Sequence, residues 1–243
     1  MASYTRLGSF LLAHELAADP FGKVYRGLVV AGSGLERHVL VRTFSEDMNE
    51  AGIGGRMEEA GKVAALLAGQ RGFGHGYKVE GGRPAYVVCD YIPGRSLAQM
   101  IEKAKHEQIP LGVDHALSVL QGVAQALVQL HGKGVSHGVL SPHSVWVSFE
   151  GATHLLDAPY AAQAKPLLGR APIASAALQR YRPSGQASPL HQDLYALGAL
   201  LYELLTLDKL PTSDLIPATL GKATLKAAQE DSPIPPEILS LLK

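Results

Sequence analysis

The sequence predicts an α+β protein with two lobes, a small antiparallel sheet lobe carrying one helix and a larger, mainly helical lobe. Three observations support this prediction. The first ninety residues read as five short strands separated by turn residues, with one helix among them. The later residues form long apolar segments with helical periodicity. A Pro-Gly break at residues 91–94 separates the two patterns, so we expect an N-terminal lobe at 1–90 and a C-terminal lobe at 91–243.

The composition is that of a soluble globular protein. Of the 243 residues, 47% are hydrophobic, which is enough for a sizeable core. Lys plus Arg and Asp plus Glu are each 22, so no bulk charge favours nucleic acid or anionic membranes. No apolar run approaches the roughly 18–20 residues of a membrane span, and the N-terminus lacks the features of a signal peptide. Cys89 is the only cysteine, which excludes an internal disulfide and favours the cytoplasm.

Turn residues delimit each expected strand of the sheet lobe. Strands are expected at residues 9–16, 22–30, 36–44, 75–81 and 83–91. The turns are Asp19-Pro20, the Gly-Ser-Gly stretch at 32–34 and Gly81-Gly82. A helix is expected over 57–67, because its apolar residues recur at helical spacing and share one face. Those residues are Met57, Ala60, Val63, Ala64 and Leu67.

The C-terminal lobe is predicted to contain three long helices. They are expected at residues 96–106, 113–134 and 193–206. Gly134 stands where a left-handed helix cap is expected. The small-residue-rich stretch 161–177 is predicted to form loops. The last residues, 235–243, read as the beginning of an amphipathic helix, so the chain is expected to be a fragment of a longer protein.

Together with this layout, several segments resemble the bacterial Ser/Thr protein kinase (Hanks-type) fold over nearly the whole chain. The segments are GKVYRG, PGRSL, LHGKGVSHGVLSPHSVWV, LLDAP and DLYALGALLYELLT. The resemblance implies a bilobal kinase-like fold whose last helices would follow Lys243. It places the family's catalytic-loop aspartate on Val139 and its metal-binding DFG aspartate on Asp157, at the separation that the family requires.

The resemblance also implies which catalytic groups are missing from residues 137–144. Val139 replaces the aspartate that accepts the substrate hydroxyl proton, so no general base remains there. Ser141 replaces the lysine that neutralises the transferring phosphoryl group, and Ser144 replaces the asparagine that holds a metal. His137 is retained, and its implied role is structural.

The nucleotide-contacting positions differ from the family as well. In the glycine-rich loop, Ala17 and Asp19 stand within a stretch where only Gly22 remains, and Asp19 puts a negative charge where phosphate would lie. Arg42 corresponds to the strand lysine, and we expect it to form a structural ion pair with Glu59 on the helix. Because the helix register is uncertain by one residue, Glu58 is the rival partner.

Two bulky side chains are expected to fill the place of the adenine. Leu40 stands where the family has a small alanine above the ring, and Trp146 where it has an aliphatic residue below. An indole buries about 200 Å², so we expect side chains to replace ATP between the lobes. The alternative is that Trp146 turns outward and the cleft stays open. Asp157 is expected to bond local backbone, and Asp193 is implied to bond the backbone of the catalytic loop.

The sequence therefore predicts a pseudokinase: a module without enzymatic activity, cofactor or metal that binds a protein partner, or acts allosterically, in cytoplasmic signalling. ATP binding is not expected. Two alternatives remain, a nucleotide-binding sensor and a weakly active kinase that uses Asp157 and Arg42.

The segment 159–179 is expected to be either a docking surface or a mobile loop. A zinc site is disfavoured, because the evenly spaced histidines at 131, 137 and 143 lack further ligands. A Ser141–His143 hydrolase pair lacks an orienting acid.

Overall fold

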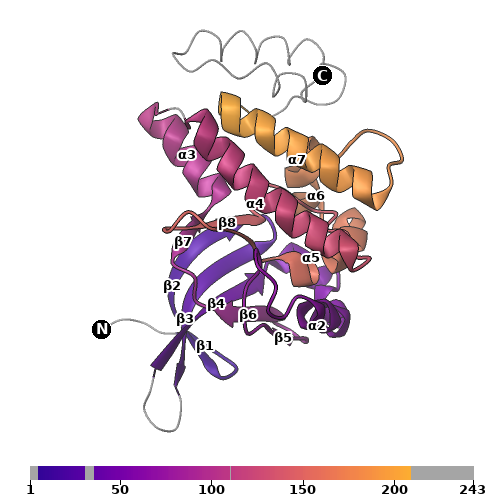
Figure 1. Ribbon diagram of the computed structural model, residues 1–243. Helices are drawn as coiled ribbons and strands as arrows, with labels where there is room; N and C mark the ends of the chain where they lie inside the picture. The colour runs from indigo at the N-terminus through magenta and orange to yellow at the C-terminus, as the bar shows by residue number, and fades with distance from the viewer. Residues whose placement is uncertain (1–4, 31–35, 110, 209–243) are drawn as a thin grey trace.

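The computed structural model describes residues 5–30, 36–109 and 111–208, and its first lobe is built on a six-stranded antiparallel sheet (Figure 1). The strands are β1 (Thr5–Leu7), β2 (Phe10–Asp19), β3 (Gly22–Val30), β4 (Glu36–Phe44), β5 (Lys78–Glu80) and β6 (Tyr86–Asp90), in the order β1-β2-β3-β4-β6-β5. Five of them are the predicted strands. The predicted strand count is wrong by one, because the short strand β1 pairs with β2 at the edge of the sheet.

Strand β4 lies between β3 and β6 and is buried on both faces. Its side chains alternate between the two faces, as in any strand. Val39 and Val41 face one apolar cluster with Phe10, whereas Leu40 lies in another cluster next to Trp146. Because alternate side chains of a strand share one face, Leu40 and Arg42 both point toward the space between the lobes.

The sheet lobe contains more helix than the sequence predicts. The predicted helix is present as α2 (Met57–Leu66), and all five residues of its predicted apolar face are buried. It is preceded by η1 (Ile53–Arg56) and by α1 (Glu46–Glu50), which the sequence does not predict. Ser45 caps α1, because its hydroxyl accepts a hydrogen bond from the backbone N–H of Met48.

The second lobe is formed by long helices and a small sheet. The elements are β7 (Gly94–Ser96), α3 (Leu97–Glu107), α4 (Val113–Gly132), β8 (Val145–Ser148), β9 (Thr153–Leu155) and α7 (Pro189–Thr206). Figure 1 shows α3, α4 and α7 together on the side of the molecule away from the large sheet. The core between α4 and α7 contains Leu130 and Leu200, both fully buried. Gly134 has φ of 72° and its N–H donates to the carbonyl of His131, as predicted for a left-handed cap.

The loops predicted at residues 161–177 are a wrong prediction, because this stretch is helical. It forms α5 (Ala158–Ala164), η2 (Lys165–Arg170), α6 (Pro172–Leu178) and η3 (Gln179–Tyr181). Alanine has the highest helix propensity, and Pro159, Pro166 and Pro172 each lie in the first two positions of a helix, where proline is favourable. Helix α5 packs against α2 of the sheet lobe in one apolar cluster.

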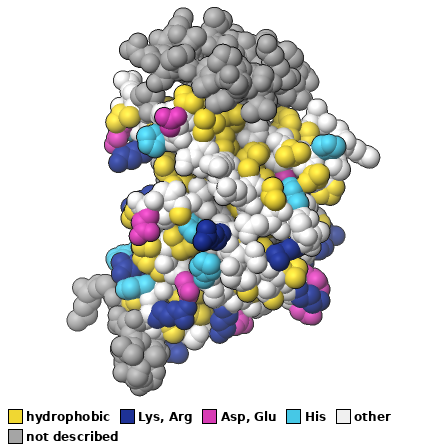
Figure 2. Space-filling view, in the orientation of Figure 1, with side chains coloured by type: hydrophobic (Ala, Val, Ile, Leu, Met, Phe, Trp, Pro, Cys, Tyr) yellow, Lys and Arg dark blue, Asp and Glu magenta, His cyan; other side chains and the backbone are white. Residues whose placement is uncertain are grey.

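Two sequence expectations fall outside the described residues, namely the turn at 32–34 and the amphipathic helix at 235–243. Among the described helices, none combines the length and hydrophobicity needed to cross a bilayer. On the face shown in Figure 2, both basic and acidic side chains are present and lie scattered among histidine, hydrophobic and other groups, in keeping with the formal net charge of zero.

Candidate functional site

The space between the two lobes is filled by apolar side chains. Leu40 of β4 and Trp146 of β8 are only 2% and 3% exposed. They form one cluster with Ala17, Val24 and Cys89, which come from β2, β3 and β6. Burial raises the pKa of the Cys89 thiol to about 12, so this cysteine is a neutral core residue.

The indole of Trp146 points inward and is anchored to the segment that links the lobes. Its Nε1–H donates a hydrogen bond to the backbone carbonyl of Ile92, at 3.1 Å. The ring is therefore buried without an unpaired donor. The cavity that remains beside it, bounded also by Tyr77 and Tyr160, has a volume of about 30 Å³.

A buried ion pair borders the same cavity, which Arg42 helps to line. The Arg42 guanidinium donates from Nη1 to Oδ1 of Asp19 at 2.9 Å and from Nη2 to Oδ2 at 2.6 Å. The two side chains are 12% and 3% exposed. Oδ1 of Asp19 also accepts hydrogen bonds from the backbone N–H groups of Phe21, at 2.8 Å, and Gly22, at 3.1 Å. One carboxylate thus holds both the β2–β3 turn and the guanidinium.

The electrostatics of this pair favour the charged form of both partners. Burial alone would raise the pKa of Asp19, but the charge and hydrogen bonds of Arg42 outweigh it and hold that pKa below its ordinary value. Burial would likewise lower the pKa of Arg42, and the neighbouring Asp19 charge raises it instead. The pair is therefore ionised across the neutral pH range.

The predicted pair of Arg42 with Glu59 is wrong, and so is the rival pair with Glu58. Glu59 lies on the exposed face of α2 and pairs with Lys62 at 2.6 Å, while Glu58 lies 3.7 Å from the same Lys62. The physical reason is the orientation of α2. Its apolar stripe faces the core, so positions 58 and 59 point to solvent, whereas Asp19 projects from the adjoining hairpin onto Arg42.

The positions at which the resemblance implies catalytic groups are buried. Val139 is 2% exposed and lies in an apolar cluster with Tyr160 and Ala161 of α5. Ser141 is also buried, and its hydroxyl has no hydrogen-bond partner among the described residues. The hydroxyl of Ser144 donates to the backbone carbonyl of Val139 at 3.2 Å. These side chains therefore make core contacts in the described conformation.

The sequence predicts that the carboxylate of Asp157 bonds local backbone, and this prediction is wrong. The carboxylate contacts a histidine instead. Its Oδ1 lies 2.9 Å from Nε2 of the fully buried His137. Helix α5 begins at the next residue without a side-chain cap from Asp157. Burial alone would lower the pKa of His137, but the Asp157 charge and hydrogen bond outweigh it and raise that pKa.

Asp193 at the beginning of α7 organises the backbone of the catalytic-loop segment. Its carboxylate accepts hydrogen bonds from the N–H groups of His137, at 2.8 Å, and Gly138, at 2.6 Å. Nε2 of His131 lies 2.8 Å from the same carboxylate. This backbone contact is the one that the resemblance implies. Asp193 is fully buried, so its position is fixed by the α4 and α7 packing around it.

The His137–Asp157 contact predicts a pH-dependent stability. The folded pKa of His137 is raised above its unfolded value of about 6.5. Its contribution to the free energy of unfolding is therefore complete below pH of about 6.5 and is lost as pH rises through the folded pKa. Urea unfolding of wild type between pH 6 and 9 should show this decline, and H137Q should flatten it. H106Q, at an exposed site on α3, is the control; equal slopes for H137Q and wild type would contradict the assignment.

Within residues 5–30, 36–109 and 111–208, no group of three or more His, Cys, Asp or Glu side chains has the arrangement of a metal site. The three evenly spaced histidines, at 131, 137 and 143, each contact different residues. His131 touches Asp193 and His137 touches Asp157, while His143 lines the small interlobe cavity. They do not converge on a common point.

Sequence reasoning missed the Asp19–Arg42 pair and the role of Tyr160. In the sheet, Val24 of β3 lies opposite Ala17 of β2 on one side and Arg42 of β4 on the other. Aligning the three strands as antiparallel hairpins therefore brings the end of β2, where Asp19 lies, close to Arg42, and this alignment was the available signal for the pair. Tyr160 packs edge-to-face on Phe44, with ring centroids 4.9 Å apart. Nothing in the sequence pattern indicates that contact, because it joins α5 to β4 across the lobes.

The sequence matches the family described as protein tyrosine and serine/threonine kinase over residues 10–243. Over 224 residues, 86% of this chain, it is 26% identical to the serine/threonine-protein kinase pkn2 of Myxococcus xanthus, of which it spans 26%. Over 148 residues, 57% of this chain, it is 29% identical to a probable inactive receptor kinase of Arabidopsis thaliana, of which it spans 14%. Among solved structures, it resembles the apo form of PpkA-294 with a TM-score of 0.63 and 19% identity, covering all of this chain and 91% of the other.

These matches correct one expectation from the sequence. The expectation that the chain is not an enzyme is wrong at the level that the comparisons reach, because its family and relatives such as pkn2 are protein kinases, which are enzymes. That expectation rests on Val139, Ser141 and Ser144, and residue identity at three positions does not by itself decide activity. The match over residues 10–243 and the two-lobed structure agree: the chain belongs to the protein kinase family and has the bacterial Hanks-type Ser/Thr kinase fold.

Proposed function

We propose that this chain is a signalling domain of the kinase fold that binds a protein partner and whose nucleotide cleft, in the described state, is closed by its own side chains. The observation that carries the proposal is the Asp19–Arg42 ion pair. In the family, the residue at position 42 contacts the nucleotide phosphates. Here a carboxylate of the same chain takes that contact, with two oxygens on the guanidinium.

The rest of the cleft does not fit Mg-ATP in this conformation. The cavity between Leu40 and Trp146 has a volume of about 30 Å³, whereas ligand pockets usually have about 300–1,000 Å³. The indole N–H already uses the carbonyl of Ile92 in the linking segment. Nucleotide entry would therefore require Trp146 to rotate out and Asp19 to leave Arg42.

The membership of a signalling kinase family supports a protein as the partner. The helical segment α5 to η3 presents an ordered surface with exposed side chains such as Ile173. We therefore favour the docking surface over the mobile loop for this segment. We also propose that the protein is cytoplasmic and that the boundary between its two lobes lies at residues 90–91.

Trp146 allows a direct test, because it is the only tryptophan. We expect millimolar ATP with Mg²⁺ to leave the Trp146 fluorescence and the thermal midpoint of wild type unchanged. D19N combined with W146A removes both side chains that block entry, so the midpoint of this double variant should rise with ATP relative to its own ligand-free value by mass action. E15Q, which alters an exposed pair with Lys23, is the matched control. A saturable fluorescence quench in wild type at micromolar ATP would show that the cleft is open.

A second function is favoured by one observation. Asp157 is buried near enough to Arg42 for its charge to help raise the pKa of that guanidinium. If a partner drew Asp19 away, the two residues would face a common space, as a nucleotide sensor or a weakly active kinase requires. Transfer of radiolabelled phosphate by the full-length protein in Mg²⁺ or Mn²⁺, lost in D157N, would support this reading.

A further inference from the structure

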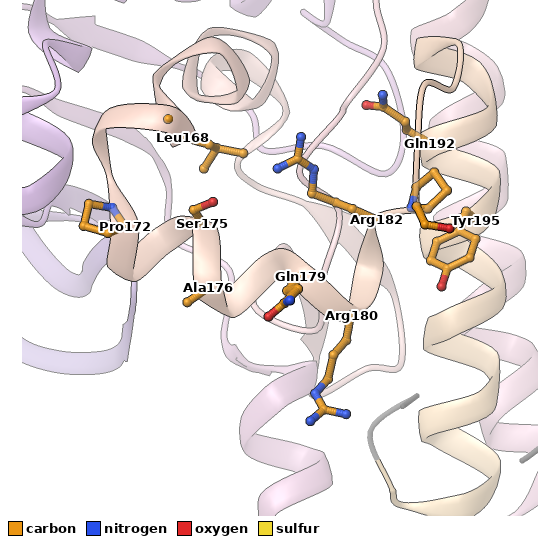
Figure 3. A pocket seen from close by; sticks show the side chains of 13 residues that line it. Leu168, Pro172, Ser175, Ala176, Gln179, Arg180, Arg182, Gln192 and Tyr195 are labelled. Carbon is orange, nitrogen blue, oxygen red and sulfur yellow. The ribbon is translucent and has the colours of Figure 1, made fainter. Parts of the chain in front are cut away.

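A second, much larger pocket lies away from the cleft, between α6 and the beginning of α7. It has a volume of about 660 Å³. Figure 3 shows Leu168, Pro172 and Ser175 along one side and Gln192 and Tyr195 of α7 along the other. The connection from Arg182 to Gly185 forms the remaining wall. Three segments therefore form the pocket, and none of its lining residues also lines the small cavity beside Trp146.

Its charge is of one sign. The described residues that line it include two arginines and neither aspartate nor glutamate. In Figure 3 the guanidinium of Arg182 reaches across the pocket toward Leu168 and Ser175, while Arg180 points in the opposite direction. Arg182 is half-buried and forms no ion pair with the described carboxylates. A half-buried guanidinium without a carboxylate partner favours an anionic group beside it.

The other lining groups suit a peptide. The pocket is far larger than a single phosphate or carboxylate needs, so it has room for a larger molecule that carries the anion. Pro172, Pro183 and Tyr195 offer apolar surface, and Ser175 and Gln192 offer hydrogen-bonding groups beside it. One cationic contact flanked by apolar surface matches a short segment with one anionic residue among apolar ones.

We propose that this pocket binds a segment of the protein partner whose single anionic side chain, a carboxylate or a phosphate, pairs with Arg182. The inference rests on the proposed protein-binding function and names the chemistry of the partner. The planar guanidinium donates two parallel hydrogen bonds to either anion, and phosphate binds more strongly because it carries more charge.

Oriented peptide libraries test this inference without knowledge of the partner. Three libraries carry phosphoserine, glutamate or serine at a fixed central position, with all other positions random. We expect wild type to enrich peptides from the two anionic libraries and not from the serine library. R182Q should weaken their binding roughly tenfold or more, because it removes a charged hydrogen bond. R170Q, which removes an exposed arginine outside the pocket, is the matched control and should bind as wild type does.

The outcomes separate the two anions and the two proposals. Because phosphate pairs more strongly with a guanidinium in any case, glutamate enrichment that equals or exceeds phosphoserine enrichment identifies an acidic partner, and clearly stronger phosphoserine enrichment favours a phosphorylated one. Competition by inorganic phosphate at the same concentration as the peptide would show that the pocket is a simple anion site and would overturn the proposal. Equal peptide binding by R182Q and wild type, with an unchanged thermal midpoint, would overturn it as well.

If a partner purified with the full-length protein binds R182Q as well as wild type, the pocket assignment fails while the protein-binding function stands. If full-length wild type captures no partner that binds again after purification, the proposed function itself fails.

Discussion

Val139→Asp is expected to lower the free energy of unfolding by about 3–4 kcal/mol at pH 7, although it restores the residue type that the family carries there. Val139 is 2% exposed and lies among apolar side chains of α5. A carboxylate in this position must either stay charged in an apolar cluster or remain protonated far above its ordinary pKa of about 3.9. Both routes cost stability. Urea denaturation of V139D and wild type measures the difference.

The matched control is V139N, which has the same shape and no charge. It should be destabilised less than V139D at pH 7. Because the buried carboxyl would have a raised folded pKa, the penalty of V139D appears above pH of about 4 and grows as pH rises to that folded pKa. The two variants should therefore converge in acid. Equal stability of V139D and V139N at pH 7 would mean that the new carboxylate reaches water or a cation.

Asp19→Asn is expected to lower the free energy of unfolding by about 3–5 kcal/mol, because it leaves the Arg42 guanidinium buried without an opposing charge. The folded pKa of Asp19 is lowered, so the contribution of this carboxylate is complete above pH of about 3.9 and is lost as pH falls through the folded pKa. D19N should lack this loss in acid. Thermal or urea unfolding between pH 3 and 7 measures both effects.

Two further variants isolate the origin of that effect. D19N combined with R42M removes both charges and should recover part of the lost stability, since no buried charge is then left without an opposing one. E15Q removes a carboxylate from an exposed pair with Lys23 and should cost far less than D19N, because solvent screens the pair. A cost for D19N as small as that of E15Q would show that Arg42 is solvated once Asp19 is replaced.

The fold was accessible from the sequence because its strands and long helices carry strong periodic patterns. The apolar stripe of α2 and the cap at Gly134 were predicted residue by residue. Strand β1 was missed because three residues at a sheet edge give no periodic signal. Small residues predict loops at 161–177, but the alanines and N-terminal prolines of this stretch are helix signals, and the stretch is helical.

The candidate site was only partly accessible. Leu40 and Trp146 were identified as bulky residues from their positions in the resemblance, and both lie buried between the lobes. The partner of Arg42 was misassigned, because strand periodicity fixes which face a side chain occupies but not which acidic residue reaches it across a hairpin. The pocket around Arg182 has no sequence signal, since its walls come from segments that meet only because η3 packs on both α6 and α7.

The position of α5 has a consequence for folding. Its residues Tyr160 and Ala164 share one apolar core with Phe44 and Met57 of the sheet lobe and with Leu178 of the helical lobe. Neither lobe can bury these surfaces alone, because each supplies only part of that core. We therefore expect the two lobes to unfold as a single cooperative unit, because loss of either one exposes the apolar surface of the other.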